Sequence, residues 1–508
     1  MTDRAEPAAE PDGVETRPPP STFGGILQRL GPGLIIAGAI VGSGELVATT
    51  KVGAEAGFWL LWLIVIGCLI KVFTQVEFGR MAITEGRTTL SALDVVPGPR
   101  LRANWIVWFW LFMTLVGIAQ LGGIVGGVGQ ALAISTPITH DGRAFNEVQD
   151  EWVERRVARR VADHRGQLVT PADVAREESA ARAAADAPVP FDPVLWAALI
   201  SLPTSLMLVI GRYRLVQIVS TALVASFTLF TVVTLILLQM RPEWAIRAKD
   251  VGDGLSFRMP PPREGLDPLP TALAAFGIIG VGAAELISYP YWCLEKGYAR
   301  WSGPGADSPD WVERARGWMR VLRYDAFLSM VVYTVGTVAF FLLGAAVLGR
   351  TGLVPENKSM IRTLAAMYEP VFGEHAGTLF LGGALAVLYS TYFVASASYA
   401  RVGADAIGIF GKRPLTPERR RFWERVLCAA IPVASVFIFG FVRAPTGLIL
   451  AAGVSQALML PVLGFAALWF RYRRGHPEIR PGRLWDAMLW LSGLGLLIAG
   501  GWAAWTRF

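Results

Sequence analysis

The chain has 508 residues, of which 53% are hydrophobic and only 17% are charged, and its formal net charge is +7. Soluble globular proteins usually carry about 25% charged residues, so this composition excludes a protein that exposes its whole surface to water. The charged residues lie in blocks between apolar runs of roughly 18–25 residues, which are long enough to cross a bilayer. The sequence therefore predicts an all-α protein integral to a membrane, with the lipid bilayer as a partner.

Residues 1–22 are rich in proline, acidic residues and alanine and lack the apolar core of a signal peptide, so we interpret them as a disordered cytoplasmic tail. The remainder, residues 23–508, is expected to form one transmembrane domain of about eleven helices. Hydropathy places these helices near residues 26–50, 58–76, 105–134, 193–210, 216–238, 269–291, 326–348, 378–399, 426–442, 448–470 and 487–505.

The connections between the spans fall into two sets that differ in arginine and lysine content. The more basic set lies around residues 80–102, 212–214, 314–323, 412–421 and 471–483. Basic connections stay on the cytoplasmic side, so we expect the N-terminus in the cytoplasm and, after eleven spans, the C-terminus outside a bacterial-type inner (plasma) membrane. These connections account for the net charge, so neither a nucleic-acid partner nor a protein partner is indicated.

One connection differs from the others in length and charge. Residues 136–190 carry many charges of both signs, such as Glu151, Arg155 and Glu177, together with alanine-rich stretches. This composition favours one or two solvated extracellular helices, which we interpret as a surface insertion without chemistry of its own.

The first span is interrupted at its centre. Gly42, Ser43 and Gly44 place two glycines mid-helix, where each costs about 1 kcal/mol relative to alanine, and Glu45 follows directly. A charged side chain at the bilayer centre costs about 2.5–3.5 kcal/mol on insertion scales. A chain keeps such a carboxylate only where it faces a cavity, a partner or an ion.

The sixth span has a similar interruption, in which Gly280 and Gly282 lead through Ala284 to Glu285. The first span opens the first five helices and the sixth opens the second five. Glycine-interrupted helices at matching places of two halves indicate a transporter binding site, where unwound backbone exposes carbonyl and amide groups. The alternative is structural: the glycines permit close helix packing, and the acids pair with arginine or lysine.

With these residues the sequence resembles the Nramp metal-ion transporters. The resemblance extends from Gly31–Gly57 in the first span to Gln75–Leu90 in the second, Gly277–Gly280 and Tyr289 in the sixth, and Ser455–Pro461 in the tenth. It implies a secondary-active transporter, or symporter, with the leucine-transporter-like fold of two inverted five-helix repeats. These would cover about residues 26–240 and 268–470, with an extra helix at about 487–505.

The sequence departs from that family at the metal-binding motifs. The family's first helix carries Asp-Pro-Gly-Asn, of which only the glycine, Gly44, is kept. The family's sixth helix carries Met-Pro-His, and the matching places here hold Ala284, Glu285 and Leu286. In the third helix Gly117 and Gln120 stand where the family has acids linked to proton movement. We therefore expect transport to be weakly proton-coupled or uncoupled, unless Glu45 or Glu285 carries the proton.

These departures imply a site made entirely of oxygen ligands. Glu45, Glu285 and Gln456 are the candidate metal ligands, together with backbone carbonyls near Gly42 and Gly280. Without the soft methionine sulfur such a site suits a hard divalent cation, carried as substrate. We expect no cofactor.

A second hypothesis starts from the glycines. Gly42-Ser43-Gly44 also resembles the glycine signature of amino-acid transporters of the same superfamily, in which freed amides hold a substrate carboxylate. The two glutamates would then bind an amine or a proton of a small organic solute. A non-transporting relative is a third possibility. An enzyme is not indicated, because the sequence has no phosphate-binding loop, no Ser-His-Asp constellation and no His/Cys metal cluster.

Overall fold

The computed structural model describes residues 16–164, 166–211, 213–261, 267–303, 308–411 and 415–506. Within these residues eleven helical segments are long and apolar enough to cross a membrane, which confirms the expected all-α membrane fold. Residues 1–15 of the expected tail, and Arg212, Lys412 and Arg413 of the basic connections, lie outside the described residues.

The described part of the expected tail, residues 16–22, is held against the helices. The backbone N–H of Arg17 donates to the carbonyl oxygen of Trp301 at 3.1 Å. The indole N–H of Trp318 donates to the carbonyl oxygen of Arg17 at 3.0 Å. Backbone hydrogen bonds therefore order this segment before the first helix begins at Phe23.

Of the first five spans, the first two are divided into shorter helices and the next three are single helices. They are α2 (Pro32–Ile40), η1 (Ser43–Thr49) and α3 (Thr50–Ala56); α4 (Leu61–Leu69) and α5 (Lys71–Glu85); α7 (Trp105–Ser135); α10 (Asp192–Ile210); and α11 (Tyr213–Leu238). Of these, η1 is a π-helix.

The remaining six spans form the second half of the chain. They are α13 (Pro268–Ile278) and α14 (Ala283–Lys296); α16 (Pro309–Leu343), η2 (Gly344–Leu348) and α17 (Gly349–Thr351); α19 (Glu369–Phe372), η3 (Gly373–His375) and α20 (Ala376–Phe410); α21 (Pro417–Val442); α22 (Pro445–Trp469) and η4 (Phe470–Arg474); and α23 (Arg483–Trp505).

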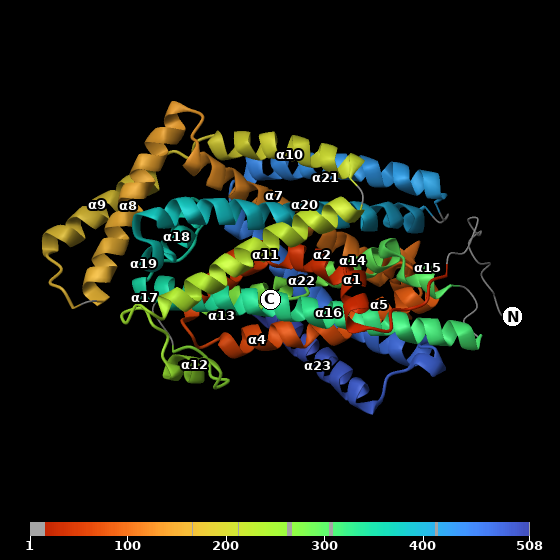
Figure 1. The fold of residues 1–508 in the computed structure, drawn as a ribbon. Coiled ribbons are helices and arrows are strands. Elements are labelled where there is room, and N and C mark those ends of the chain that lie inside the picture. The colour runs from red at the N-terminus through yellow and green to blue at the C-terminus, as the bar shows by residue number, and fades with distance from the viewer. Residues whose placement is uncertain are drawn as a thin grey trace.

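Shorter elements connect the spans. They are α1 (Phe23–Arg29), α6 (Thr89–Leu93), the strands β1 (Arg100–Leu101) and β2 (Ala103–Asn104), α8 (His140–His164), α9 (Pro171–Asp186), α12 (Ala248–Gly254), α15 (Tyr298–Ser302), α18 (Met360–Ala366) and η5 (Pro477–Ile479). The predicted insertion therefore contains two helices, α8 and α9, which protrude at one end of the bundle (Figure 1). We call this the insertion end, and the opposite end, where residues 16–22 lie against α15 and α16, the N-terminal end.

Polar residues in the connections begin several spans. The side chain of Asn104 accepts from the backbone N–H of Ile106 at the start of α7, at 3.0 Å. Ser308 does the same for α16, accepting from Trp311 at 3.2 Å. Such caps satisfy N–H groups that have no partner within the first turn of a helix.

The two halves of the bundle make matching contacts. In the first span α2 packs against α11 of the fifth span and α16 of the seventh. In the sixth span α13 packs against α22 of the tenth span and α14 against α5 of the second. Likewise α7 packs against α10 as α20 packs against α21. Because five spans reverse the direction of the chain, the second half enters the membrane from the opposite side, so the repeats are inverted. The eleventh span, α23, lies outside this pattern against α22 and α5 (Figure 1).

Glycines let two of these helices approach backbone to backbone. A Cβ at Gly277 of α13 would collide with the carbonyl oxygen of Gly453 and lie 2.7 Å from the nitrogen of Ala457, both on α22. We expect Gly277→Ala to lower the stability of the purified protein by about 1–3 kcal/mol, the usual cost of overpacking. Thermal unfolding in detergent measures this effect. The control is Gly382→Ala, where nothing lies within 4 Å of the added Cβ; an equal loss there would contradict the packing argument.

Candidate functional site

Both predicted interruptions are present. The first half-helix α2 ends at Ile40 and η1 begins at Ser43, with Gly42 between them at φ −166° and ψ −116°. In the sixth span α13 ends at Ile278 and α14 begins at Ala283. Gly280 lies between them at φ 58°, in the left-handed region that glycine adopts most readily. The glycines that predicted the breaks thus lie within them.

The same pattern, Gly-X-X-Glu-Leu, occurs at both breaks. It covers Gly42–Leu46 in the first span and Gly282–Leu286 in the sixth. In each case the glycine immediately precedes the second half-helix, and the glutamate is the third residue of that half-helix. Inverted repeats bring these two half-helix N-termini to the centre of the bundle, where their dipoles favour negative charge. Glu45 and Glu285 are therefore equivalent in sequence, although not in environment.

A small pocket of about 30 Å³ lies at the centre, between spans 1, 3, 6, 8 and 10. Five of the nine predicted site residues line it: Ser43, Gly44, Ala284, Glu285 and Gln456. The other four, Gly42, Glu45, Gly280 and Gly282, are outside its lining. Gly282 is close to it, since a Cβ there would lie 2.6 Å from Oε2 of Glu285 and 2.8 Å from Oε1 of Gln456.

A chain of amide hydrogen bonds links four spans across this pocket. Oε1 of Gln456 accepts from the backbone N–H of Ala284 at 3.1 Å, and Nε2 of Gln456 donates to Oε1 of Gln120 at 3.3 Å. Nε2 of Gln120 then faces the hydroxyl of Ser43 at 3.5 Å. Gln120 thus belongs to the pocket, while Gly117 packs against the Tyr399 hydroxyl. This series of hydrogen bonds holds the two broken spans at a defined separation.

Among the described residues, Glu285 is the only one with an acidic side chain that lines the pocket. It belongs to the first turn of α14 and is half-buried, and its carboxylate faces the backbone of Gly282 and its own N–H. Hydroxyl groups of Thr391 and Ser398 on α20 complete the polar lining. The pocket can therefore offer one carboxylate, two amide groups and several hydroxyls to a bound group.

Glu45 lies on the other side of the break, fully buried. Its Oε1 accepts from the backbone N–H of Gly280 at 3.2 Å and from the hydroxyl of Thr337 on α16 at 3.1 Å. Its Oε2 is buried without a hydrogen-bond partner among the described residues. The structure therefore brings Glu285 and Gln456 together at the pocket but directs the carboxylate of Glu45 to the unwound backbone of the sixth span.

Lys71 of the second span is a central residue that the sequence analysis did not single out. Its ammonium is fully buried and donates to the carbonyl oxygens of Phe276 and Ile279, at 2.5 and 2.7 Å. Glu45 and Glu285 both act on it electrostatically. The signal in the sequence was a lone lysine within an apolar run at membrane depth, which by itself suggests a functional position.

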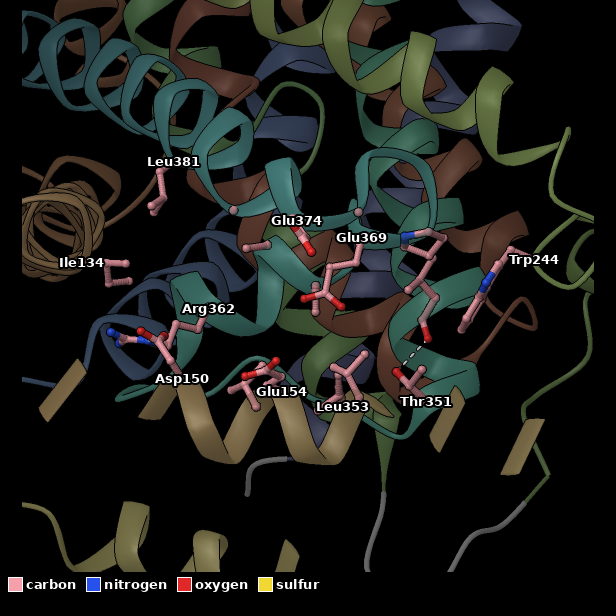
Figure 2. Close-up of a pocket in the computed structure, with 18 residues that line it drawn as sticks. Ile134, Asp150, Glu154, Trp244, Thr351, Leu353, Arg362, Glu369, Glu374 and Leu381 are labelled. Carbon is pink, nitrogen blue, oxygen red and sulfur yellow. Dashed lines mark hydrogen bonds and ion pairs between the residues drawn. The ribbon is translucent and has the colours of Figure 1, made fainter. Parts of the chain in front are cut away.

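A much larger cavity of about 530 Å³ opens at the insertion end (Figure 2). Its wall includes Glu154 of α8 and Glu369 and Glu374 of the eighth span. Arg362 of α18 joins the insertion to the bundle there, donating to Asp150 and to Asn146, each at 2.5 Å. Burial lowers the pKa of the Arg362 guanidinium from its ordinary value, against the opposing effect of Asp150. This cavity does not include the central pocket.

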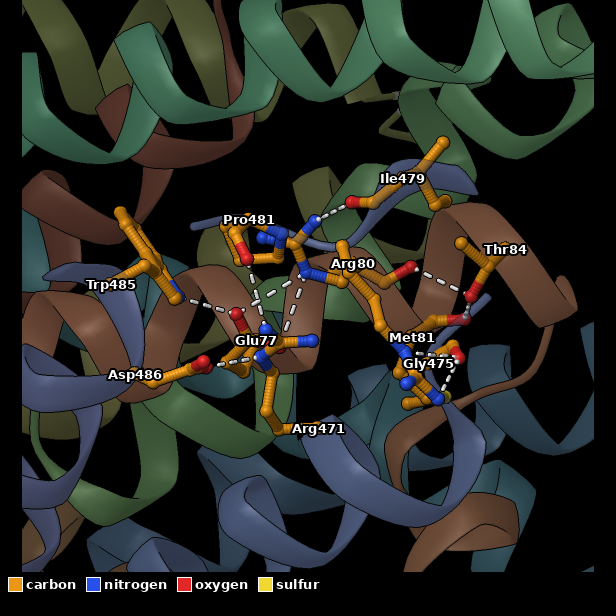
Figure 3. Close-up of polar contacts among 11 residues, drawn as sticks. Glu77, Arg80, Met81, Thr84, Arg471, Gly475, Ile479, Pro481, Trp485 and Asp486 are labelled. Atoms are coloured by element: carbon orange, nitrogen blue, oxygen red, sulfur yellow. Dashed lines mark hydrogen bonds and ion pairs between the residues drawn. The ribbon is translucent and has the colours of Figure 1, made fainter. Parts of the chain in front are cut away.

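A polar network joins several elements at the N-terminal end (Figure 3). Glu77 of α5 accepts from the indole N–H of Trp485 at 2.6 Å and from Arg80, and Arg80 donates to the carbonyl of Ile479 at 2.9 Å. Arg471 pairs with Asp486 at 2.7 Å. These contacts tie the second span to the connection between the last two spans.

The chain is similar to known proteins in both sequence and structure. Residues 175–506 match the family described as natural resistance-associated macrophage protein-like. An uncharacterized protein of Pasteurella multocida is 22% identical over 498 residues, which cover 94% of this chain and 91% of the relative.

Among solved structures, the Eremococcus coleocola manganese transporter in complex with an aromatic bis-isothiourea substituted compound matches with a TM-score of 0.64 at 16% identity. The match covers 96% of this chain and 88% of the transporter. A mutant of the same transporter matches with a TM-score of 0.62 at 17% identity, over the same shares of both chains. At such identity the likeness establishes a common fold.

Proposed function

The chain belongs to the natural resistance-associated macrophage protein-like family, and from this premise we propose that it is a secondary-active transporter whose cargo is a divalent metal cation. The eleven apolar helices support transport across a membrane, and the manganese transporter that shares the fold supports a metal as cargo. The basic connections favour an N-terminus in the cytoplasm of a bacterial-type inner membrane. The remaining support comes from the central pocket.

The observation that carries the proposal is the combination of size and charge at that pocket. A cavity needs about 10–15 Å³ to hold one water molecule, so about 30 Å³ has room for one or two such groups. A small ion with little hydration fits this space, and its one acid, Glu285, supplies negative charge. The other polar groups that line it offer oxygen atoms, the ligands that hard divalent cations prefer.

The broken helices supply the means of moving such an ion. Residues 41–42 and 279–282 lie between the half-helices and belong to neither, so each half-helix can tilt without breaking an entire span. In this superfamily architecture the site lies where the two repeats meet, and one repeat rocks against the other around it. The amide chain through Gln120 and Gln456 spans that boundary, so we expect it to rearrange during transport.

One observation favours a second candidate, a small organic solute with an ammonium group. With both central acids ionised, the ammonium of Lys71 would offset one of them and leave a single net negative charge for a cargo to neutralise. A singly charged ammonium would balance this charge, whereas a divalent ion would leave an excess. On sequence alone we inferred a hard divalent ion from an all-oxygen ligand set that did not include Lys71.

Calorimetry on the purified protein in detergent separates the two candidates. The titrants are Mg²⁺, Mn²⁺ and Ca²⁺ in one series, and methylammonium, glycine and a set of larger amino acids in the other. We expect saturable heat with at least one divalent ion and none with the organic series. Binding confined to the organic series would replace the metal with the second candidate, and absence of any binding would contradict both.

A further inference from the structure

The break in the sixth span is held open by two side chains from other spans. In a continuous α-helix the N–H of Gly280 would donate to the carbonyl oxygen of Phe276, four residues earlier. Here that N–H donates to Glu45 at 3.2 Å, and that carbonyl accepts from Lys71 at 2.5 Å. The carboxylate of Glu45 therefore replaces the acceptor of this helical hydrogen bond, and the ammonium of Lys71 replaces its donor.

The ammonium of Lys71 is surrounded as a bound cation would be. Two main-chain carbonyl oxygens, of Phe276 and Ile279, lie within 2.7 Å of it, and the aromatic ring of Phe276 lies 4.6 Å from it. Two carboxylates, Glu45 and Glu285, act on it through space. Burying an ammonium without such partners would cost several kcal/mol, so these groups are what keep Lys71 at membrane depth.

Small monovalent cations bind to this same set of groups, namely freed carbonyls at a helix break with a carboxylate nearby. We propose that the break in the sixth span is a monovalent-cation site that the chain fills with its own ammonium. Lys71 is therefore a tethered cation, and removing its side chain exposes a site for a free ion such as Na⁺ or for methylammonium. Because the tethered ion cannot leave, transport does not draw on a sodium or potassium gradient at this position.

Only this last consequence rests on the proposed transport function; the site itself is tested without any cargo. The experiment compares thermal unfolding of the wild type and of Lys71→Ala in NaCl, methylammonium chloride and choline chloride at equal ionic strength. We expect the wild-type midpoint to be the same in all three salts. We expect Lys71→Ala to unfold at a lower temperature in choline chloride and to recover by about 2–4 °C, saturably, with Na⁺ or methylammonium.

Three further variants separate a tethered cation from a lysine that merely packs. Lys71→Arg keeps the charge, so its midpoint should not depend on the salt. Adding Glu45→Gln to Lys71→Ala removes the nearby carboxylate, and it should weaken the recovery at least tenfold in cation concentration. Lys71→Met replaces Lys71→Ala if the latter does not fold, since it keeps most of the side-chain volume.

Two results would overturn the proposal. One is a folded Lys71→Ala or Lys71→Met variant whose midpoint is the same in choline chloride as in the other salts. The other is a wild type that Na⁺ itself stabilises over choline, because a site already filled by Lys71 has no room for a second cation. The wild-type comparison of Na⁺ with choline is available even where neither variant folds, and neither of these two cations is a candidate cargo.

Discussion

Replacing Glu285 with glutamine is expected to abolish binding of a cationic cargo to the central pocket. Glu285 is the only acid in the pocket lining, so the variant leaves that lining without formal charge. Losing one member of a buried charge interaction costs about 2–5 kcal/mol or more, which corresponds to a loss of affinity between about 30-fold and a few thousand-fold. Calorimetry with the ion that binds the wild type best measures this loss.

The matched control is Glu45→Gln, because it changes the equivalent residue of the other repeat. Glu45 does not line the pocket, and a glutamine oxygen can still accept from the N–H of Gly280. We therefore expect Glu45→Gln to weaken binding less than Glu285→Gln and to act mainly on stability. Equal loss in both variants would instead support a site in which the two carboxylates bind one divalent ion together. Normal binding in Glu285→Gln would remove Glu285 from the site.

The second large effect is expected at Asp325 of α16, a buried residue that no sequence motif marked. Its Oδ1 accepts from the backbone N–H of Gly31 at 2.8 Å, and its Oδ2 from the N–H of Gly33 at 2.5 Å and the hydroxyl of Tyr289 at 3.0 Å. One carboxylate thus anchors the start of the first span to the sixth and seventh spans. We expect Asp325→Ala to destabilise the protein by about 3–5 kcal/mol, since it leaves three buried donors without a partner.

Thermal unfolding of the purified variant, together with its yield in the membrane fraction, measures this effect. Asp186→Ala is the control, because Asp186 is an exposed residue at the end of α9 and should change stability by no more than about 0.5 kcal/mol. Asp325→Asn should be intermediate, since the amide oxygen can still accept one or two of the three hydrogen bonds. An Asp325→Ala variant as stable as the wild type would show that water replaces the carboxylate.

Local sequence predicted the spans well but not all of their ends. The first span was expected at residues 26–50, whereas the structure has a separate helix α1 and a span from Pro32 to Ala56. Gly31 and Pro32 separate the two helices, because Gly31 is extended at φ 171° and Pro32 begins α2. An average hydropathy does not register this boundary, since Ile26, Leu27 and Leu30 before it are as apolar as the residues after it.

The sequence by itself determined the features that depend on near neighbours in the chain. Apolar runs determined the eleven spans, and glycines determined the breaks at Gly42 and Gly280, because helix formation and its interruption are local.

Only the tertiary structure decided how the central charges are shared. Glu45 and Glu285 occupy equivalent places in the two repeats, yet Glu285 faces the pocket while Glu45 meets the N–H of Gly280. Lys71, more than 200 residues from the carbonyls that it binds, lies at the same break as Glu45. Contacts between such distant residues depend on how the repeats pack, so they cannot be predicted from the spacing of residues in the sequence.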